Sequence, residues 1–110
     1  MKMVIALIRP EQLPAVKRAL FEAQIHRLTA MNVLGTAPRA EQQMYRGIER
    51  QVTLFQRVRI EVVVTAAMAE RAIAAITRGA KETGGHGKIF VQEVQEAITV
   101  WNGMRGPQTL

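Results

Sequence analysis

The stretch "VRIEVVV", residues Val58 to Val64, decides the fold because it is the clearest strand in the sequence. β-branched residues dominate it, and Arg59 and Glu61 alternate with apolar residues at its start, as expected of a strand with one buried face. Three other stretches are also predicted strands. They are "MVIALI" (3–8), "RLTAMNVLG" (27–35) and "KIFVQEV" (88–94).

In two of the segments between these strands, apolar residues recur at the spacing of a helix. Between residues 11 and 23, the recurring apolar side chains are Leu13, Val16, Leu20 and Phe21. Between residues 66 and 81, they are Ala67, Met68, Ala72, Ile73 and Ile76. Pro14 suits the start of the first helix, where a missing N–H is tolerated, and Gly79 is predicted to stop the second.

The resulting order predicts an α+β fold, a ferredoxin-like βαββαβ sandwich with two helices on one face of an antiparallel sheet. A long exposed loop, about residues 36–55, separates the second and third strands. We expect a single domain over residues 1–110. The short apolar piece "AITVW" (97–101) is expected to close the core before a flexible tail at about 102–110.

Composition limits the classes of protein that fit. The chain of 110 residues has no cysteine and is 48% hydrophobic, which predicts a folded protein of a reducing cytoplasm. The apolar run at the N-terminus ends too early to cross a membrane, so we expect no membrane insertion. The net charge of +6 would attract nucleotides, nucleic acid or an acidic membrane surface, and does not choose among them.

Strands this apolar cannot leave one face of the sheet in water. The two helices cover only one face, and a chain of this length has little else to cover the other. We therefore predict a homo-oligomer in which the sheets of neighbouring copies pack against each other.

The turn "KETGGHGKIFV", residues 81–91, has two interpretations. Glycines allow a ligand to approach backbone N–H groups, and Lys88 could add a charge for a phosphate. The alternative is a tight connection that needs glycine only for its backbone angles. His86 could meet a phosphate or a metal, or be an exposed turn residue, and no spacing argument supports a metal site.

Together with this turn, three other stretches closely resemble the nitrogen regulatory PII signal-transduction family. They are "MKMVIALIRP" (1–10), "YRG" (45–47) and "AITVWNG" (97–103). The resemblance, which extends from residue 1 to about 103, implies a homotrimer of ferredoxin-like subunits that binds ATP or ADP between subunits. It also implies that the long loop binds a target protein, such as a membrane transporter or an enzyme of nitrogen metabolism.

The resemblance implies a role for individual residues. In the glycine turn, Gly85 and Gly87 would give backbone contacts and Lys88 a phosphate contact, with Gly84 and His86 in the same loop. Elsewhere, Thr29 and Gly35 would approach base and ribose, Val63 the adenine and Glu61 the ribose. The target-binding loop would include Tyr45, Arg46, Gly47 and Arg50.

The sequence also departs from the family pattern. Arg50 stands where many members carry a tyrosine that is uridylylated, which argues against that modification. In "GTAPRAE" (35–41), Arg39 could replace a ligand-holding arginine, but nothing replaces the glutamine, which argues against 2-oxoglutarate sensing. Trp101 replaces a phosphate-binding arginine, with a hydrophobic plug as its alternative role. We expect weak ATP binding and consider ADP, AMP or another ligand.

Three other functions were weighed against a nucleotide-binding regulator: an enzyme, an RNA-binding module and a docking protein. An enzyme with a serine or cysteine nucleophile is excluded, because the chain has neither residue. RNA-recognition domains share this order of strands and helices, yet Phe90 is the lone aromatic residue on the strand that would stack bases, so no nucleic acid is expected. A PII-shaped docking trimer without nucleotide sensing is the third possibility.

Overall fold

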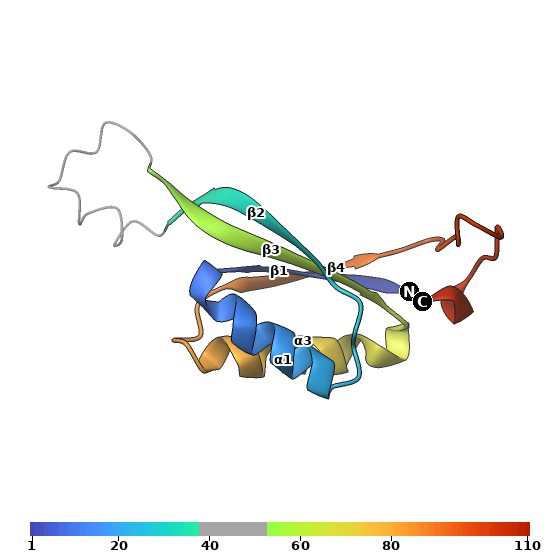
Figure 1. Cartoon of the computed structure of the whole chain (residues 1–110), viewed down its shortest axis with the longest axis horizontal. Helices are drawn as coiled ribbons and strands as arrows, with labels where there is room; N and C mark the ends of the chain where they lie inside the picture. The colour runs from blue at the N-terminus through green and yellow to red at the C-terminus, as the bar shows by residue number, and fades with distance from the viewer. Residues whose placement is uncertain (38–52) are drawn as a thin grey trace, which may run out of the picture.

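In the computed structural model, which describes residues 1–37 and 53–110, one antiparallel sheet carries two helices on the same face (Figure 1). The strand order in the described part is β2-β3-β1-β4. The strands are β1 (Lys2–Ile8), β2 (Thr29–Thr36), β3 (Leu54–Val64) and β4 (Lys88–Glu93), and the helices are α1 (Leu13–Glu22) and α3 (Ala69–Lys81). This arrangement confirms the predicted βαββαβ sandwich.

The strand β3 organises the sheet, since it lies between β2, which pairs with residues 54–61, and β1, which pairs with residues 58–64. Val62 lies opposite Val4 of β1, and Glu61 lies opposite Thr29 of β2. The even-numbered residues of β3 from Val58 to Val64 are buried, because alternate side chains of a strand point to one face. The alternation seen in the sequence therefore identifies the face of β3 that packs against the helices.

The boundaries of the connection between β2 and β3 differ from the predicted loop of residues 36–55. Thr36 still belongs to β2, and Leu54 and Phe55 already belong to β3. The prediction was wrong at these ends because these residues lack the run of β-branched neighbours that marks Val58 to Val64. Residues 38–52 lie outside the described part of the chain.

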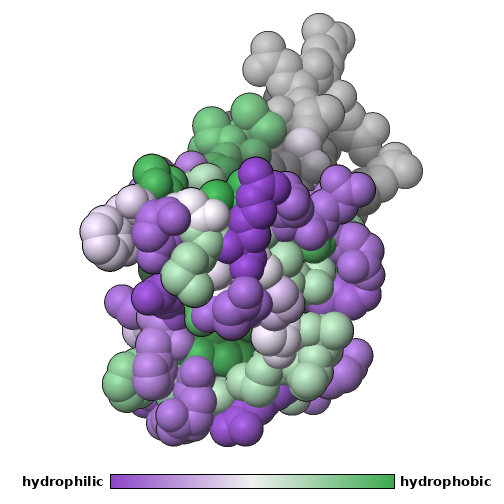
Figure 2. Space-filling model, turned by 90° about the vertical axis from the view of Figure 1, so that its right-hand side faces the viewer, coloured by the Kyte–Doolittle hydropathy of each residue, from purple (hydrophilic) through white to green (hydrophobic). Residues whose placement is uncertain are grey.

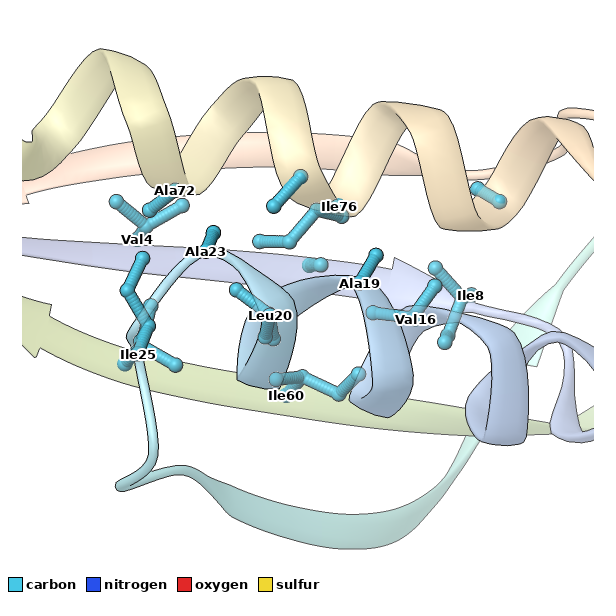
Figure 3. Close-up of a cluster of buried hydrophobic side chains, with 14 of the residues drawn as sticks. Val4, Ile8, Val16, Ala19, Leu20, Ala23, Ile25, Ile60, Ala72 and Ile76 are labelled. Carbon is cyan, nitrogen blue, oxygen red and sulfur yellow. The ribbon is translucent and has the colours of Figure 1, made fainter.

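The core lies between the helices and the sheet (Figure 3). Val4 and Ile60 from the sheet meet Val16 and Leu20 of α1 and Ile76 of α3, and all five side chains are at most 1% exposed. Alanines of both helices, among them Ala19 of α1 and Ala72 of α3, are buried in this core. Small residues at this contact allow the helix backbones to approach closely.

Two helical predictions need correction. Phe21 is not part of the core: it is 64% exposed, and its ring stacks on that of His26 with 4.4 Å between ring centroids. Gly79 does not stop the second helix, which continues to Lys81. Gly79 instead provides space for α1, as its backbone packs against that of Val16.

The C-terminal part forms a hairpin, residues 97–106, that extends away from β4 (Figure 1). An isolated bridge joins Ile98 to Arg105, and the N–H of Gly106 donates to the Ala97 carbonyl at 3.0 Å. Val100 is 98% exposed and Trp101 is 86% exposed. The prediction that "AITVW" closes the core, and the plug role of Trp101, are wrong for the single chain, because the hairpin tip lies beyond the helices.

The sheet face opposite the helices is not covered by a described helix, and it carries apolar side chains from β1 and β4 beside charged ones from β3. Met3, Ile5 and Leu7 of β1 alternate with the helix-facing side chains, and Phe90 of β4 lies opposite Ile5. Phe90 is 49% exposed. We refer to this surface, odd-numbered on β1 and β3 and even-numbered on β4, as the open face. Neither described helix is long and apolar enough to cross a bilayer.

Candidate functional site

The glycine turn between α3 and β4 needs glycine at three positions, because its backbone has positive φ angles there. Gly84, Gly85 and Gly87 have φ values of 97°, 72° and 136°, which side chains rarely allow. The Gly85 N–H donates to the Ala80 carbonyl at 2.9 Å and closes the end of α3. A Cβ on Gly87 would lie 2.8 Å from the Leu7 carbonyl oxygen, so the turn presses its backbone against β1.

The turn borders a cavity of about 360 Å³, which we call the cationic cavity. His86, Gly87 and Lys88 contribute from the turn and β4, and Gly35 contributes from β2. None of its described lining residues is acidic, and Arg9 and Arg57 add positive charge. The full lining is Leu7, Ile8, Arg9, Val33, Leu34, Gly35, Thr36, Arg57, His86, Gly87 and Lys88. A site of this kind favours an anionic group next to an apolar one.

Sequence reasoning missed Arg9 and Arg57 as neighbours of the glycine turn. Register places them there: Leu7 pairs with Lys88 on one side and with Arg59 on the other, and Arg57 pairs with Val33. Arg9 directly follows β1 and Arg57 lies inside β3, so no local signal in the sequence indicated that the two arginines share a cavity. Gly84 and Gly85, by contrast, are not among the residues that line the cationic cavity.

A second cavity, of about 870 Å³, lies at the other end of the sheet, and we call it the hydroxyl cavity. It contains three of the predicted site residues, Thr29, Glu61 and Val63. Glu61 forms an ion pair with Arg59 at 2.8 Å. The remaining lining residues are Gln24, Ile25, His26, Arg27, Leu28, Val64, Thr65, Met68, Ala97, Ile98, Thr99, Pro107, Thr109 and Leu110.

Figure 2 views the molecule from the end at which the C-terminal hairpin lies. Hydrophobic surface is visible there in a recess between hydrophilic residues. Uncharged polar groups prevail over charges among the residues of the hydroxyl cavity, which include four threonines. Such a surface suits a ligand that combines apolar area with hydroxyl groups.

The predicted site residues therefore form two groups that do not meet within one chain. Gly35, His86, Gly87 and Lys88 belong to the cationic cavity, whereas Thr29, Glu61 and Val63 belong to the hydroxyl cavity. Thr29 and Gly35 lie on the same strand, six residues apart, which corresponds to about 20 Å. Five further predicted residues lie outside the described part of the chain: Arg39, Tyr45, Arg46, Gly47 and Arg50.

Charged groups elsewhere on the described surface form simple pairs. Arg18 contacts Glu82 at 3.2 Å, and Arg105 contacts Glu96 at 2.8 Å. A hydrogen bond from Lys2, together with its positive charge, lowers the pKa of the Glu93 carboxyl. Within residues 1–37 and 53–110, no three His, Asp or Glu side chains gather closely enough to hold a metal ion.

Comparisons with known proteins all indicate the same family. Residues 1–104 match the family described as nitrogen regulatory protein P-II. The chain is 39% identical to the nitrogen regulatory protein GlnK1 of Methanosarcina mazei, over all of this chain and 97% of that protein. It is 40% identical to the P-II protein of Rhodospirillum rubrum, over 96% of both chains. It is 43% identical to GlnK2 of Haloferax mediterranei, over 96% of this chain and 87% of that protein.

Proposed function

The chain belongs to the nitrogen regulatory protein P-II family, and we propose that it is a homotrimer that binds an adenine nucleotide between subunits and controls a target protein. P-II proteins are regulators that transmit a signal and are not enzymes. The proposal adds the ligand, its location and the assembly to this family assignment.

The observation that supports the proposal best is the separation of the two cavities. Residues that would hold the phosphates and residues that would hold the base and ribose lie at opposite ends of one sheet. A single nucleotide cannot use both ends of one chain, but it can lie between the cationic cavity of one copy and the hydroxyl cavity of the next. Such head-to-tail contacts close into a ring when the rotation between copies allows it, as in a trimer.

The open face supports the same assembly. Phe90 lies on it opposite Ile5 and is half exposed, whereas Ile5 is already buried in the single chain. Covering this face with another copy removes apolar area from water, which is worth roughly 25 cal/mol for each Å². In this proposal the sheets face the inside of the trimer and the helices face outward.

Positively charged side chains line the cationic cavity, where we place the phosphates of the nucleotide. Lys88 and Arg57 line the cationic cavity together with the backbone of Gly87, so an anionic group is favoured there. Trp101 stands where the family pattern has an arginine, which removes one charge from the site. We therefore expect ATP to bind weakly and ADP or AMP to compete with it, and we leave 2-oxoglutarate out of the proposal.

The target would be held by the connection between β2 and β3, with Tyr45, Arg46, Gly47 and Arg50 as contact residues. A membrane transporter or an enzyme of nitrogen metabolism is the class of partner that fits a P-II regulator. The proposal assumes a protein of the cytoplasm. Nucleic acid has no role in the proposal, because Phe90 is the lone aromatic residue of β4.

Calorimetric titration of the purified protein with ATP, ADP and AMP tests the proposal directly. We expect heat from at least one nucleotide at millimolar concentration or below, and a trimer mass by light scattering. A trimer that takes up none of the three would be a docking protein without nucleotide sensing. Binding to an RNA pool that survives about 200 mM salt would favour the RNA-recognition alternative.

A further inference from the structure

Gln12 is fully buried, at 0% exposed, although its side chain is polar. It ends the 3₁₀ turn η1 (Pro10–Gln12), which follows β1. A buried amide needs hydrogen-bond partners, and those of Gln12 are Arg9 and the end of α3. We propose that Gln12 is a positioning residue that holds Arg9 and the glycine turn at the spacing that the phosphates of the nucleotide require. The inference rests on the proposed function, because it assigns those phosphates to the cationic cavity.

The first partner of Gln12 is Arg9, which lines the cationic cavity. The Arg9 N–H donates to the Gln12 Oε1 at 2.7 Å, and the Gln12 N–H donates back to the Arg9 carbonyl at 3.0 Å. Two bonds in opposite directions close a ring over four residues, so the Arg9 backbone keeps one orientation as the chain leaves β1. The side chain of Arg9 therefore starts from a fixed point.

The second partner is the carbonyl of Ala80 near the end of α3, 68 residues away along the chain. The Gln12 Nε2 donates to this carbonyl at 3.3 Å. The N–H groups of Thr83 and Gly85 donate to the same oxygen at 3.2 Å and 2.9 Å, so the glycine turn begins from this group. The two partners also fix which way the Gln12 amide points, since an N–H needs its oxygen and a carbonyl needs its nitrogen.

Both ends of the glycine turn are therefore held by the short stretch of chain from Leu7 to Gln12. At one end, a Cβ on Gly87 would lie 2.8 Å from the Leu7 carbonyl oxygen. At the other end, Gln12 holds the Ala80 carbonyl. This stretch and the turn form two walls of the cationic cavity. Gln12 thus sets the separation of the two walls.

The bonds of Gln12 act on the phosphate end of the ligand and not on its nucleoside end. Gln12 and Ala80 are absent from the lining of both cavities, so the Gln12 side chain itself contacts no ligand. Arg9 and the glycine turn belong to the cationic cavity, whereas the hydroxyl cavity lies at the other end of the sheet. Loss of the bonds should weaken ADP and ATP and leave adenosine unaffected.

Gln12→Met tests the inference, because methionine is similar in size to glutamine and makes neither bond. We expect calorimetry to show about tenfold weaker binding of ADP, as when one charged contact to a phosphate is disturbed, and unchanged binding of adenosine. Val62→Ala is the matched control, since Val62 is 1% exposed but lines neither cavity. It should lower stability and leave both affinities as in the wild type.

Amide hydrogen exchange follows the bonds themselves in the ligand-free protein. In Gln12→Met, the amides of Arg9 and Gly85 should exchange several-fold faster, because the first loses its acceptor and the second loses the support of Ala80. In Val62→Ala, both should keep their protection relative to the amide of Ala23, whose N–H donates within α1.

A second variant covers the case in which Gln12→Met does not fold. Gln12→Asn keeps both polar groups on a side chain that is one methylene shorter, so it cannot reach Arg9 and Ala80 together. It should give the same pattern, with ADP weakened and adenosine unchanged.

The outcomes separate the two proposals. Unchanged ADP affinity in Gln12→Met, or an equal weakening of adenosine and ADP, overturns the role of Gln12 and leaves the proposed function intact. Unchanged exchange at Gly85 also overturns it. Absence of any nucleotide binding by the wild type overturns the proposed function and this inference with it.

Discussion

Gly79 of α3 lies directly against Val16 of α1, and a Cβ on Gly79 would come within 2.7 Å of the Val16 Cα and 2.8 Å of the Ala15 carbonyl oxygen. The two helix backbones touch at this point, without a side chain between them. The position of the helices on the sheet, and with it the position of the glycine turn at the end of α3, depends on this contact.

Gly79→Ala should destabilise the fold although alanine is the better helix former. Alanine gains about 1 kcal/mol of helix propensity, whereas overpacking against backbone costs about 1–3 kcal/mol. We expect a net loss of up to about 2 kcal/mol in the free energy of unfolding, measured in urea. Arg71→Ala on the exposed side of α3 is the control and should change stability by less than about 0.5 kcal/mol. Equal stability of Gly79→Ala and wild type would show that the helices can separate freely.

Phe90→Glu should dissociate the oligomer without unfolding the chain. Phe90 is 49% exposed on the open face, so in one chain a charge there stays in water, whereas between copies it would be buried without a partner. Light scattering should report a smaller mass and circular dichroism an unchanged fold. Val91→Glu is a matched control, since Val91 is 46% exposed on the other side of the same strand and pairs with Val4. An intact oligomer in Phe90→Glu would remove the open face from the interface.

Lys88→Ala should weaken nucleotide binding and leave the assembly unchanged. Loss of a charged hydrogen bond to phosphate costs about 1.5–3 kcal/mol, which corresponds to roughly tenfold to a hundredfold in Kd. Calorimetry should show a larger effect for ADP than for adenosine. Lys81→Ala, which removes an equal charge outside the cavity lining, is the control. If Lys88→Ala instead dissociates the trimer, Lys88 is a structural residue.

Gly87→Ala should lower stability both through a steric clash with β1 and through backbone strain, and Gly103→Ala should lower it through backbone strain alone. Both Gly87 and Gly103 have positive φ, so alanine strains either by about 1–2 kcal/mol. At Gly87 an added Cβ also meets the Leu7 carbonyl oxygen at 2.8 Å, whereas at Gly103 nothing lies within 4 Å. Thermal unfolding should therefore show a larger loss for Gly87→Ala than for Gly103→Ala. Equal losses would mean that β1 and the turn are not pressed together.

The pair of Lys2 and Glu93 should contribute a pH-dependent term to stability. The hydrogen bond from Lys2, and then its charge, lower the pKa of Glu93 below its ordinary value of 4.5. A carboxyl with a lowered folded pKa stabilises the fold above its ordinary pKa, and this contribution is lost as the pH falls through the folded pKa. Lys2→Met should return the pKa of Glu93 to its ordinary range in an NMR titration, while Lys17→Met should not. An unchanged pKa in Lys2→Met would exclude the pair in solution.

Some features of the site were predictable and others were not. The glycine turn could be recognised because three glycines in four residues permit positive φ angles, which Gly84, Gly85 and Gly87 have. Arg9 and Arg57 could not be assigned to the same cavity, because their proximity arises from the pairing of β1, β2 and β3. The exposure of Trp101 was also missed, since an apolar residue gives no sign of lying on a hairpin beyond the core.

The sequence by itself determined the order of strands and helices, because alternation and helical spacing are local properties that each element needs in order to bury one face. The family, too, could be recognised from short local stretches. Only the tertiary structure decided that Thr29 and Gly35 lie in different cavities, that Gly79 is a contact between helices, and that Thr109 lines the same cavity as Thr29 and Glu61. These relationships depend on strand register and chain reversal, which bring distant residues together and leave no periodic trace in the chain.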